Sequence, residues 1–269
     1  SLVGSEMCIR DSIFAYKRER MFAYPPLEPE NAPRGEIGIP RVLNMYENYP
    51  FWATFFRGLG FRIILSPFST RAIYELGMES IPSESECYPA KLAHGHAQWL
   101  IDHGVKTIFH PCVFYEHQEV PGAQNHFNCP IVVSYPENIK NNVEAVTDGS
   151  VRYLHPFLAF TNEKVASDRL VQFCKEVWSI PEKETRHAAH LAWEEQRRAK
   201  ADVRAAGAKA LADMEKNGGS GIVLAGRPYH VDPEINHGIP ELISAYGLTV
   251  LTEDCLPIDF VPKLSLIHI

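Results

Sequence analysis

The sequence predicts an α/β protein built on a parallel sheet with helices on both faces. Short apolar segments alternate with helical patterns along the chain, as expected for repeated β-α-β units. Of the 269 residues, 45 % are hydrophobic, which is ample material for a core. We expect a flavodoxin/Rossmann-like lobe, a long helical connector and the start of a second, truncated α/β lobe.

Composition excludes several classes of protein. The net charge of −7 leaves no basic footprint for nucleic acid. We find neither an apolar run of about 18 residues nor a signal-peptide pattern, so we expect no membrane partner. Six cysteines in 269 residues are too sparse for a disulfide-stapled secreted scaffold. The sequence therefore predicts a cytoplasmic protein whose cysteines are reduced, metal-bound or buried.

The two ends are set apart from the rest. Residues 1–12 (SLVGSEMCIRDS) and 264–269 (LSLIHI) resemble translated sequencing-adapter read-through, and are left out of fold reasoning as artefacts. Cys8 then drops out as a candidate, and the chain is expected to be a fragment of a longer protein. The alternative is a genuine terminus with little tertiary packing.

The first lobe is predicted over residues 36–150, after a proline-rich linker at 13–35. Its elements follow from apolar periodicity and from proline and glycine stops. A polar loop is expected at 111–129. The predicted strands are 36–40, 61–65, 105–109 and 131–135, and the predicted helices are 43–58, 71–76 and 89–103.

A helical connector is predicted over 151–219, with helices at 163–178 and 181–216. The second lobe, 220–263, begins with strand 221–225, continues through helix 234–246 and ends with strand 248–251. A lone β-α-β unit cannot complete a sheet, so this lobe is expected to be truncated.

Cys87 is the first candidate for metal chemistry. It stands two residues before Pro89, which favours a helix start. Free backbone N–H groups at a helix N-terminus stabilise an anionic thiolate or cluster. An inert buried cysteine is the alternative.

Cys112 and Cys129 are the other two candidates. Cys112 follows strand 105–109, and sites in parallel sheets gather at the carboxyl ends of strands, where Cys87 could meet it. Cys129 precedes the predicted strand 131–135, so it ranks third. The spacing of Cys87, Cys112 and Cys129 matches no compact zinc-ribbon or ferredoxin pattern. Thiolates nevertheless favour iron–sulfur or zinc over magnesium.

Histidines provide a competing interpretation, a mixed Cys/His zinc site. Five histidines flank the same cysteines: His94, His96, His110, His117 and His126. His94 and His96 diverge on a helix and cannot easily share one ion. His96 shares a face with Trp99 and Leu100, which favours a hydrogen-bonded core histidine. We therefore rank the zinc site below the iron–sulfur cluster as an interpretation.

Other candidates are weaker. The loop Gly226-Arg227-Pro228 follows a strand and could meet a phosphate, but it lacks the dinucleotide and Walker patterns. Cys174 is expected in the core, and Cys255 could be a ligand from the second lobe. No hydrolase triad can be assembled, so no catalytic residue is assigned.

Several long segments together resemble a known family. The chain is similar to the uncharacterised domain of the large CoA-substrate-specific enzyme activases, which are related to the 2-hydroxyacyl-CoA dehydratase system. The likeness covers nearly all of residues 13–260. The segments that resemble the family are 37–52 (IGIPRVLNMYENYPFW), 81–92 (IPSESECYPAKL), 128–137 (NCPIVVSYPE) and 226–230 (GRPYH).

The resemblance implies ATPase modules upstream of this region and a dehydratase-like cluster domain. Related dehydratase subunits hold a [4Fe–4S] cluster between flavodoxin-like lobes. By position, Cys87 and Cys112 are similar to two first-lobe ligands, and a third is implied from the second lobe.

We therefore expect a fragment of an ATP-linked, oxygen-sensitive iron–sulfur electron-transfer protein, with Cys87, Cys112 and Cys129 as candidate metal ligands. Its implied partner is a dehydratase-like protein or further domains of its own chain, and a homodimer stays open. The alternatives are a non-catalytic docking or regulatory domain with buried cysteines, and the zinc site.

Overall fold

The computed structural model describes residues 13–118 and 126–257. Its main sheet has four parallel strands in the order β2-β1-β3-β5. This is the order in which flavodoxin-like sheets begin, so the predicted fold class is confirmed. The strands are β1 (Glu36–Ile39), β2 (Arg62–Leu65), β3 (Thr107–Phe109) and β5 (Arg152–Leu154).

Two strands of this sheet resume after a His-Pro pair. Strand β4 (Cys112–Tyr115) follows β3, and β6 (Phe157–Ala159) follows β5; the two pair in parallel. The Cys112 N–H donates to the Pro156 carbonyl at 3.0 Å, which carries the pairing across the break. The sequence predicts a polar loop from 111 and a helical connector from 151, and so misses β4, β5 and β6. Each of these strands is only three or four residues long and lies within two residues of a proline.

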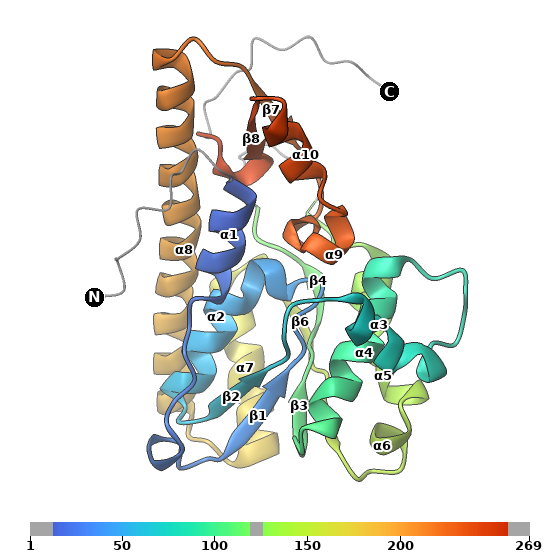
Figure 1. Cartoon of the computed structure of the whole chain (residues 1–269). Coiled ribbons are helices and arrows are strands. Elements are labelled where there is room, and N and C mark those ends of the chain that lie inside the picture. The colour runs from blue at the N-terminus through green and yellow to red at the C-terminus, as the bar shows by residue number, and fades with distance from the viewer. Residues whose placement is uncertain (1–12, 119–125, 258–269) are drawn as a thin grey trace.

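Helices cover both faces of the main sheet (Figure 1). One face holds α2 (Met45–Gly58), α7 (Glu163–Trp178) and α8 (Glu182–Lys216); the other holds α3 (Arg71–Gly77), α4 (Tyr88–Asp102), α5 (Pro130–Asn142) and α6 (Glu144–Thr147). Alternation along β1 explains the arrangement. Ile37 and Ile39 pack with α2, α7 and α8, whereas a side chain at Gly38 would meet Leu100 of α4.

Aromatic rings fill the core beneath α2. Trp52 is fully buried and meets Phe109 of β3 with ring centroids 4.7 Å apart. Phe51 of the same helix meets Trp193 of α8 at 4.6 Å. Such offset and edge-on contacts add to the free energy of burying the rings. This core fastens the long helix α8 to the main sheet.

The predicted strand 131–135 is wrong. Its residues lie in helix α5, where Val132, Tyr135 and Ile139 form one buried face. The run is apolar and short, and periodicity alone does not separate a strand from a helix in such a segment. Pro130 at the first helical position is the signal that favours the helix.

The predicted linker 13–35 contains a helix, α1 (Ile13–Phe22), that packs on α8. Arg20 donates to Glu195 at 2.8 Å and to Asp202 at 2.7 Å, both on α8. Ion pairs to another element are not visible in local periodicity, so the sequence pattern misses this helix. The predicted artefacts, 1–12 and 264–269, and Cys8 lie outside the described residues.

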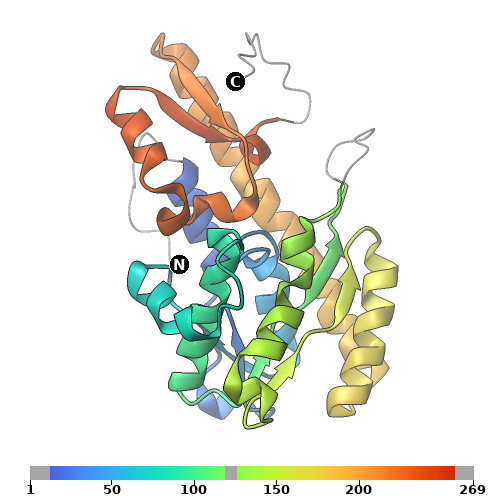
Figure 2. The same ribbon diagram turned by 90° about the vertical axis from the view of Figure 1, so that its right-hand side faces the viewer.

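A second parallel unit lies at the carboxyl edge of the main sheet (Figures 1 and 2). It comprises β7 (Gly221–Leu224), α9 (Pro233–Asn236), α10 (Ile239–Ala245) and β8 (Thr249–Thr252). The single helix predicted at 234–246 is divided, because His237 and Gly238 take left-handed φ of 53° and 74°. Helix α8 leads from the main sheet to this unit.

A buried hydrogen-bond network joins the second unit to the main sheet. The carboxylate of Asp232, which caps α9, accepts bonds from Tyr46 after β1 and Ser69 after β2. Ser69 also bonds His96 Nε2 at 3.0 Å, and Ser66 bonds His96 Nδ1 at 2.8 Å. The predicted role of His96 as a hydrogen-bonded core residue is thereby confirmed. Satisfied buried networks of this kind rigidify an interface.

Candidate metal centre

Cys87 lies where three parts of the fold meet. It is the N-cap residue of α4, exposed, with Pro89 at the second helical position. Its neighbour Glu86 accepts a hydrogen bond from Asn138 of α5 at 2.8 Å. Its other neighbour, Tyr88, donates to Glu234 of α9 at 2.6 Å. The Cys87 thiol is therefore held by both flanks at the junction of α4, α5 and the second unit.

Cys129 occupies the equivalent position on the next helix. It is the half-buried N-cap residue of α5, followed directly by Pro130. Asn128 anchors it, because its N–H donates to Phe114 and its amide to Val113, both on β4. The low ranking of Cys129 rests on a strand at 131–135. Since that segment is a helix, Cys129 starts at the carboxyl edge of the sheet, the same edge as Cys87.

Tyr229 of the second unit lies within electrostatic range of both cysteines. Burial raises the pKa of Tyr229, and the neighbouring Cys129 and Cys87 thiols raise it further. Cys129 packs on the hydrophobic cluster that contains Tyr229. Both thiols thus lie near one phenol ring, although they are 42 residues apart in the chain.

Polar groups without well-formed hydrogen bonds lie behind Cys87. They are Glu86 Oε2, the Tyr135 hydroxyl and His94 Nε2, all buried. Burial, then the Glu86 carboxylate, raise the pKa of Tyr135. Burial lowers the pKa of His94 to about 4, so this imidazole is neutral near pH 7. The Tyr135 hydroxyl lies close enough to Glu86 to interact with it, and His94 lies close enough to Asn138, so these groups form a loosely hydrogen-bonded set behind Cys87.

Cys112 belongs to a different cluster. Among the described residues, only Cys112, Glu137 and His155 bring three potential ligand atoms within 4.8 Å of one another. His155 Nδ1 lies 2.7 Å from Glu137 Oε1, at hydrogen-bond distance but without the alignment of a good hydrogen bond. Cys112 is fully buried, and burial raises the pKa of its thiol to about 12. A metal ion there would have to displace this proton.

The sequence did not indicate Glu137 or His155 as site residues. A signal was nevertheless present, because His155-Pro156 repeats the pair His110-Pro111 that precedes Cys112. Both pairs interrupt neighbouring parallel strands, which brings Cys112 beside His155. His110 is occupied differently, since its Nδ1 bonds the Tyr153 hydroxyl at 2.8 Å.

The remaining candidates have other partners. His94 Nδ1 bonds Ser80 at 2.7 Å, and His96 belongs to the Asp232 network. Cys174 is fully buried in α7, as predicted. Cys255 is also buried, and its carbonyl oxygen would lie 2.0 Å from a side-chain carbon at Gly207 of α8. Both therefore have packing roles.

Glu116 is an unusual carboxylate near the site. It accepts hydrogen bonds from three asparagine amides, of Asn44, Asn48 and Asn128, at 2.7 to 3.1 Å. Burial and the neighbouring Glu47 nevertheless raise its pKa to about 7. It borders a cavity of about 470 Å³ that reaches the second unit. Glu116 is the group most directly suited to exchange a proton near neutral pH.

The raised pKa of Glu116 predicts a pH dependence of stability. The folded protein binds this proton more tightly than the unfolded chain, so stability is lost as pH rises from about 5 to 8. Glu116→Gln should reduce the difference in unfolding free energy between these pH values by about 2 kcal/mol. Urea denaturation at both pH values measures it, with exposed Glu215→Gln as the control. An unchanged difference would contradict the assignment.

Fold and site together define an α/β domain with a parallel sheet, in which two cysteines, Cys87 and Cys129, begin helices at the carboxyl edge of the sheet. Residues 36–256 match the family model described as the CoA enzyme activase uncharacterised domain, which is more than half of the chain. The chain therefore belongs to this family, and an activase-type role follows. No curated protein and no solved structure matches it. Over residues 13–118 and 126–257, no helix has the length and apolar character needed to cross a membrane.

Proposed function

We propose that this activase domain supplies thiolate ligands to an iron–sulfur cluster that serves electron transfer. The observation that supports the proposal best is the matched placement of Cys87 and Cys129. Both are N-cap residues of adjacent helices, both precede a proline, and both lie near Tyr229. Helix N-termini favour anionic groups, and thiolates are the ligands that iron–sulfur clusters use.

Cys112 is the third predicted ligand. It lies beside His155 and Glu137, and Glu137 stands two helical turns after the first residue of α5. The sulfurs that hold one cluster bind different iron atoms, so they need not be as close as the ligands of one ion. Three thiols do not complete a four-ligand cluster. A partner protein or another part of a longer chain would supply the rest.

The wider role that we propose is that of an ATP-linked activase of the 2-hydroxyacyl-CoA dehydratase type. In this proposal, ATPase modules in other parts of a longer chain hydrolyse ATP to drive electron transfer, and a dehydratase-like enzyme receives the electron. The family assignment supports an activase in general, whereas the dehydratase partner rests on the sequence resemblance.

Metal analysis of cysteine variants tests the proposal. The chain is reconstituted with iron and sulfide without oxygen, desalted, and assayed for both elements and for visible absorption. Cys87→Ala/Cys129→Ala should lose at least about tenfold in retained iron, because even outer-shell changes cost metal sites that much. Cys174→Ala, which also removes a thiol, is the matched control. Full iron retention by the double variant would exclude this pair as ligands.

A mononuclear zinc site is the second candidate, supported by the Cys112–Glu137–His155 cluster. Sulfur, nitrogen and oxygen ligands in one group suit zinc, which accepts all three. The same measurement separates the two candidates. Loss of zinc in Cys112→Ser, with iron retained, identifies the mononuclear site, whereas loss of iron in that variant identifies Cys112 as a cluster ligand.

A further inference from the structure

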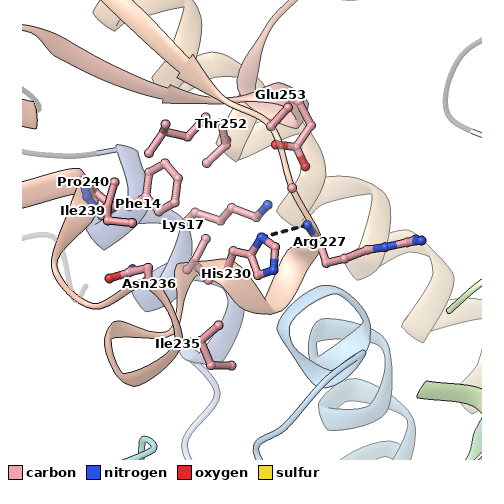
Figure 3. Close-up of a pocket in the computed structure, with 14 residues that line it drawn as sticks. Phe14, Lys17, Arg227, His230, Ile235, Asn236, Ile239, Pro240, Thr252 and Glu253 are labelled. Carbon is pink, nitrogen blue, oxygen red and sulfur yellow. Dashed lines mark hydrogen bonds between the residues drawn. The ribbon is translucent and has the colours of Figure 1, made fainter. Parts of the chain in front are cut away.

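A cavity of about 280 Å³ lies between α1 and the second unit (Figure 3). Strands β7 and β8 are parallel, and their last residues, Leu224 and Thr252, border this cavity. Ligands of open parallel sheets bind outside the carboxyl ends of the strands. The position is therefore one where the fold favours ligand binding, and it is separate from Cys87 and Cys129, which do not border the cavity.

Lys17 contributes a cation to the cavity. Its side chain comes from α1, extends across the cavity in Figure 3, and is only 4 % exposed. Its ammonium group meets Asp254 at 2.7 Å. An ammonium group has three hydrogens, so this ion pair leaves donors for a ligand.

Thr252 and His230 contribute further polar groups. Thr252 is 2 % exposed, and its hydroxyl makes no well-formed hydrogen bond, although it lies close enough to Asp254 to influence that carboxylate. His230 Nδ1 accepts a hydrogen bond from the Arg227 N–H at 3.2 Å. The neutral imidazole therefore carries its proton on Nε2, a further donor. Lys17, Thr252 and His230 thus each bring a hydrogen-bond donor to the cavity.

The wall of the cavity opposite Arg227 is apolar. Phe14, Ile239 and Pro240 lie together on the side of the cavity away from Arg227 (Figure 3). Glu253 lines the cavity near Lys17. A doubly charged phosphate would bring two negative charges close to the Glu253 and Asp254 carboxylates. The single buried cation, Lys17, would not neutralise all of these charges. A single negative charge on a hydrocarbon body matches the cavity better.

We propose that this cavity binds a small aliphatic monocarboxylate. Its carboxylate accepts hydrogen bonds from Lys17 and Thr252, and its hydrocarbon chain packs on Phe14 and Ile239. The proposal does not depend on the iron–sulfur cluster, since the cavity and the two helix-start cysteines share no residue.

Calorimetric titration of the full chain with hexanoate tests the proposal, with hexanol and inorganic phosphate as comparison ligands. Hexanoate should bind at least about tenfold more tightly than either, because a hydrogen bond to a charged group in a buried site contributes that much to affinity. Equal binding of hexanol would show that the carboxylate is not recognised. Tighter binding of phosphate would identify an anion site of a different kind. Either result overturns the proposal.

Variants assign the contacts. Thr252→Val keeps the shape of the side chain and should weaken hexanoate binding about tenfold with little change in the unfolding midpoint, because the Thr252 hydroxyl makes no well-formed hydrogen bond. Thr249→Val, at the other end of β8, is the control and should bind normally. Lys17→Gln is the second variant and should also bind at least about tenfold more weakly. Wild-type affinity in Thr252→Val or in Lys17→Gln would overturn the proposed contacts.

Discussion

Replacing Gly95 with alanine is expected to lower the free energy of unfolding by about 3 kcal/mol or more. A side-chain carbon at this position would lie 1.7 Å from the Ile73 carbonyl oxygen, so α3 and α4 would have to separate. Gly77 of α3 lies against α4 in the same way, because a side-chain carbon there would lie 2.2 Å from the Gly95 nitrogen. The two helices thus cross backbone against backbone, and the segment that joins them contains Cys87.

Urea denaturation followed by tryptophan fluorescence measures this loss. Gly104→Ala, after the end of α4, is the matched control, because no atom lies within 4 Å of its added carbon. Its φ of +82° makes a loss of about 1 kcal/mol the expected cost of left-handed backbone alone. Equal losses in the two variants would show that backbone conformation, and not the helix crossing, determines the effect at Gly95.

Replacing Asp232 with alanine is expected to cost about 3 kcal/mol. The change leaves the Tyr46 and Ser69 hydroxyls without their shared acceptor and removes the side-chain cap of α9. Because Asp232 is fully buried, water does not replace the lost contacts in the folded protein. The second unit would lose its main polar attachment to the carboxyl edge of the main sheet.

A double-mutant cycle measures this network. Asp232→Ala, Ser69→Ala and the double variant are compared by urea denaturation, and a coupling energy of about 1 kcal/mol or more is expected for residues in one network. Tyr46→Phe removes a single donor and should cost less than Asp232→Ala. A loss below about 1 kcal/mol in Asp232→Ala would mean that apolar contacts alone hold the second unit in place.

The activase role of the domain could be predicted from the sequence. Long segments of the sequence, such as 81–92 and 128–137, resemble the activase family. The family model confirms this resemblance over residues 36–256. The three candidate cysteines were predicted from the residues themselves. The resemblance implies only Cys87 and Cys112 as first-lobe ligands, together with the dehydratase partner, and all of these stay predictions.

Local sequence determined most of the elements. Helix α7 has the predicted bounds, and α3 begins at the predicted residue, Arg71, where Thr70 Oγ1 accepts a bond from the Ile73 N–H. Strands β1, β2, β3, β7 and β8 lie within one or two residues of their predictions. These elements were predictable because caps, glycines and apolar periodicity act within a few residues.

Tertiary structure alone decided the content of the site. An apolar segment, 131–135, became the buried face of α5, and this moved Cys129 to the edge where Cys87 lies. Strands broken by His-Pro pairs brought Cys112 beside His155, 43 residues further along the chain. Neither outcome is encoded in local periodicity, because each depends on which surface a segment buries and on which strand lies next to it. The sequence by itself determined that thiols and a parallel sheet are present; packing decided which thiols are neighbours.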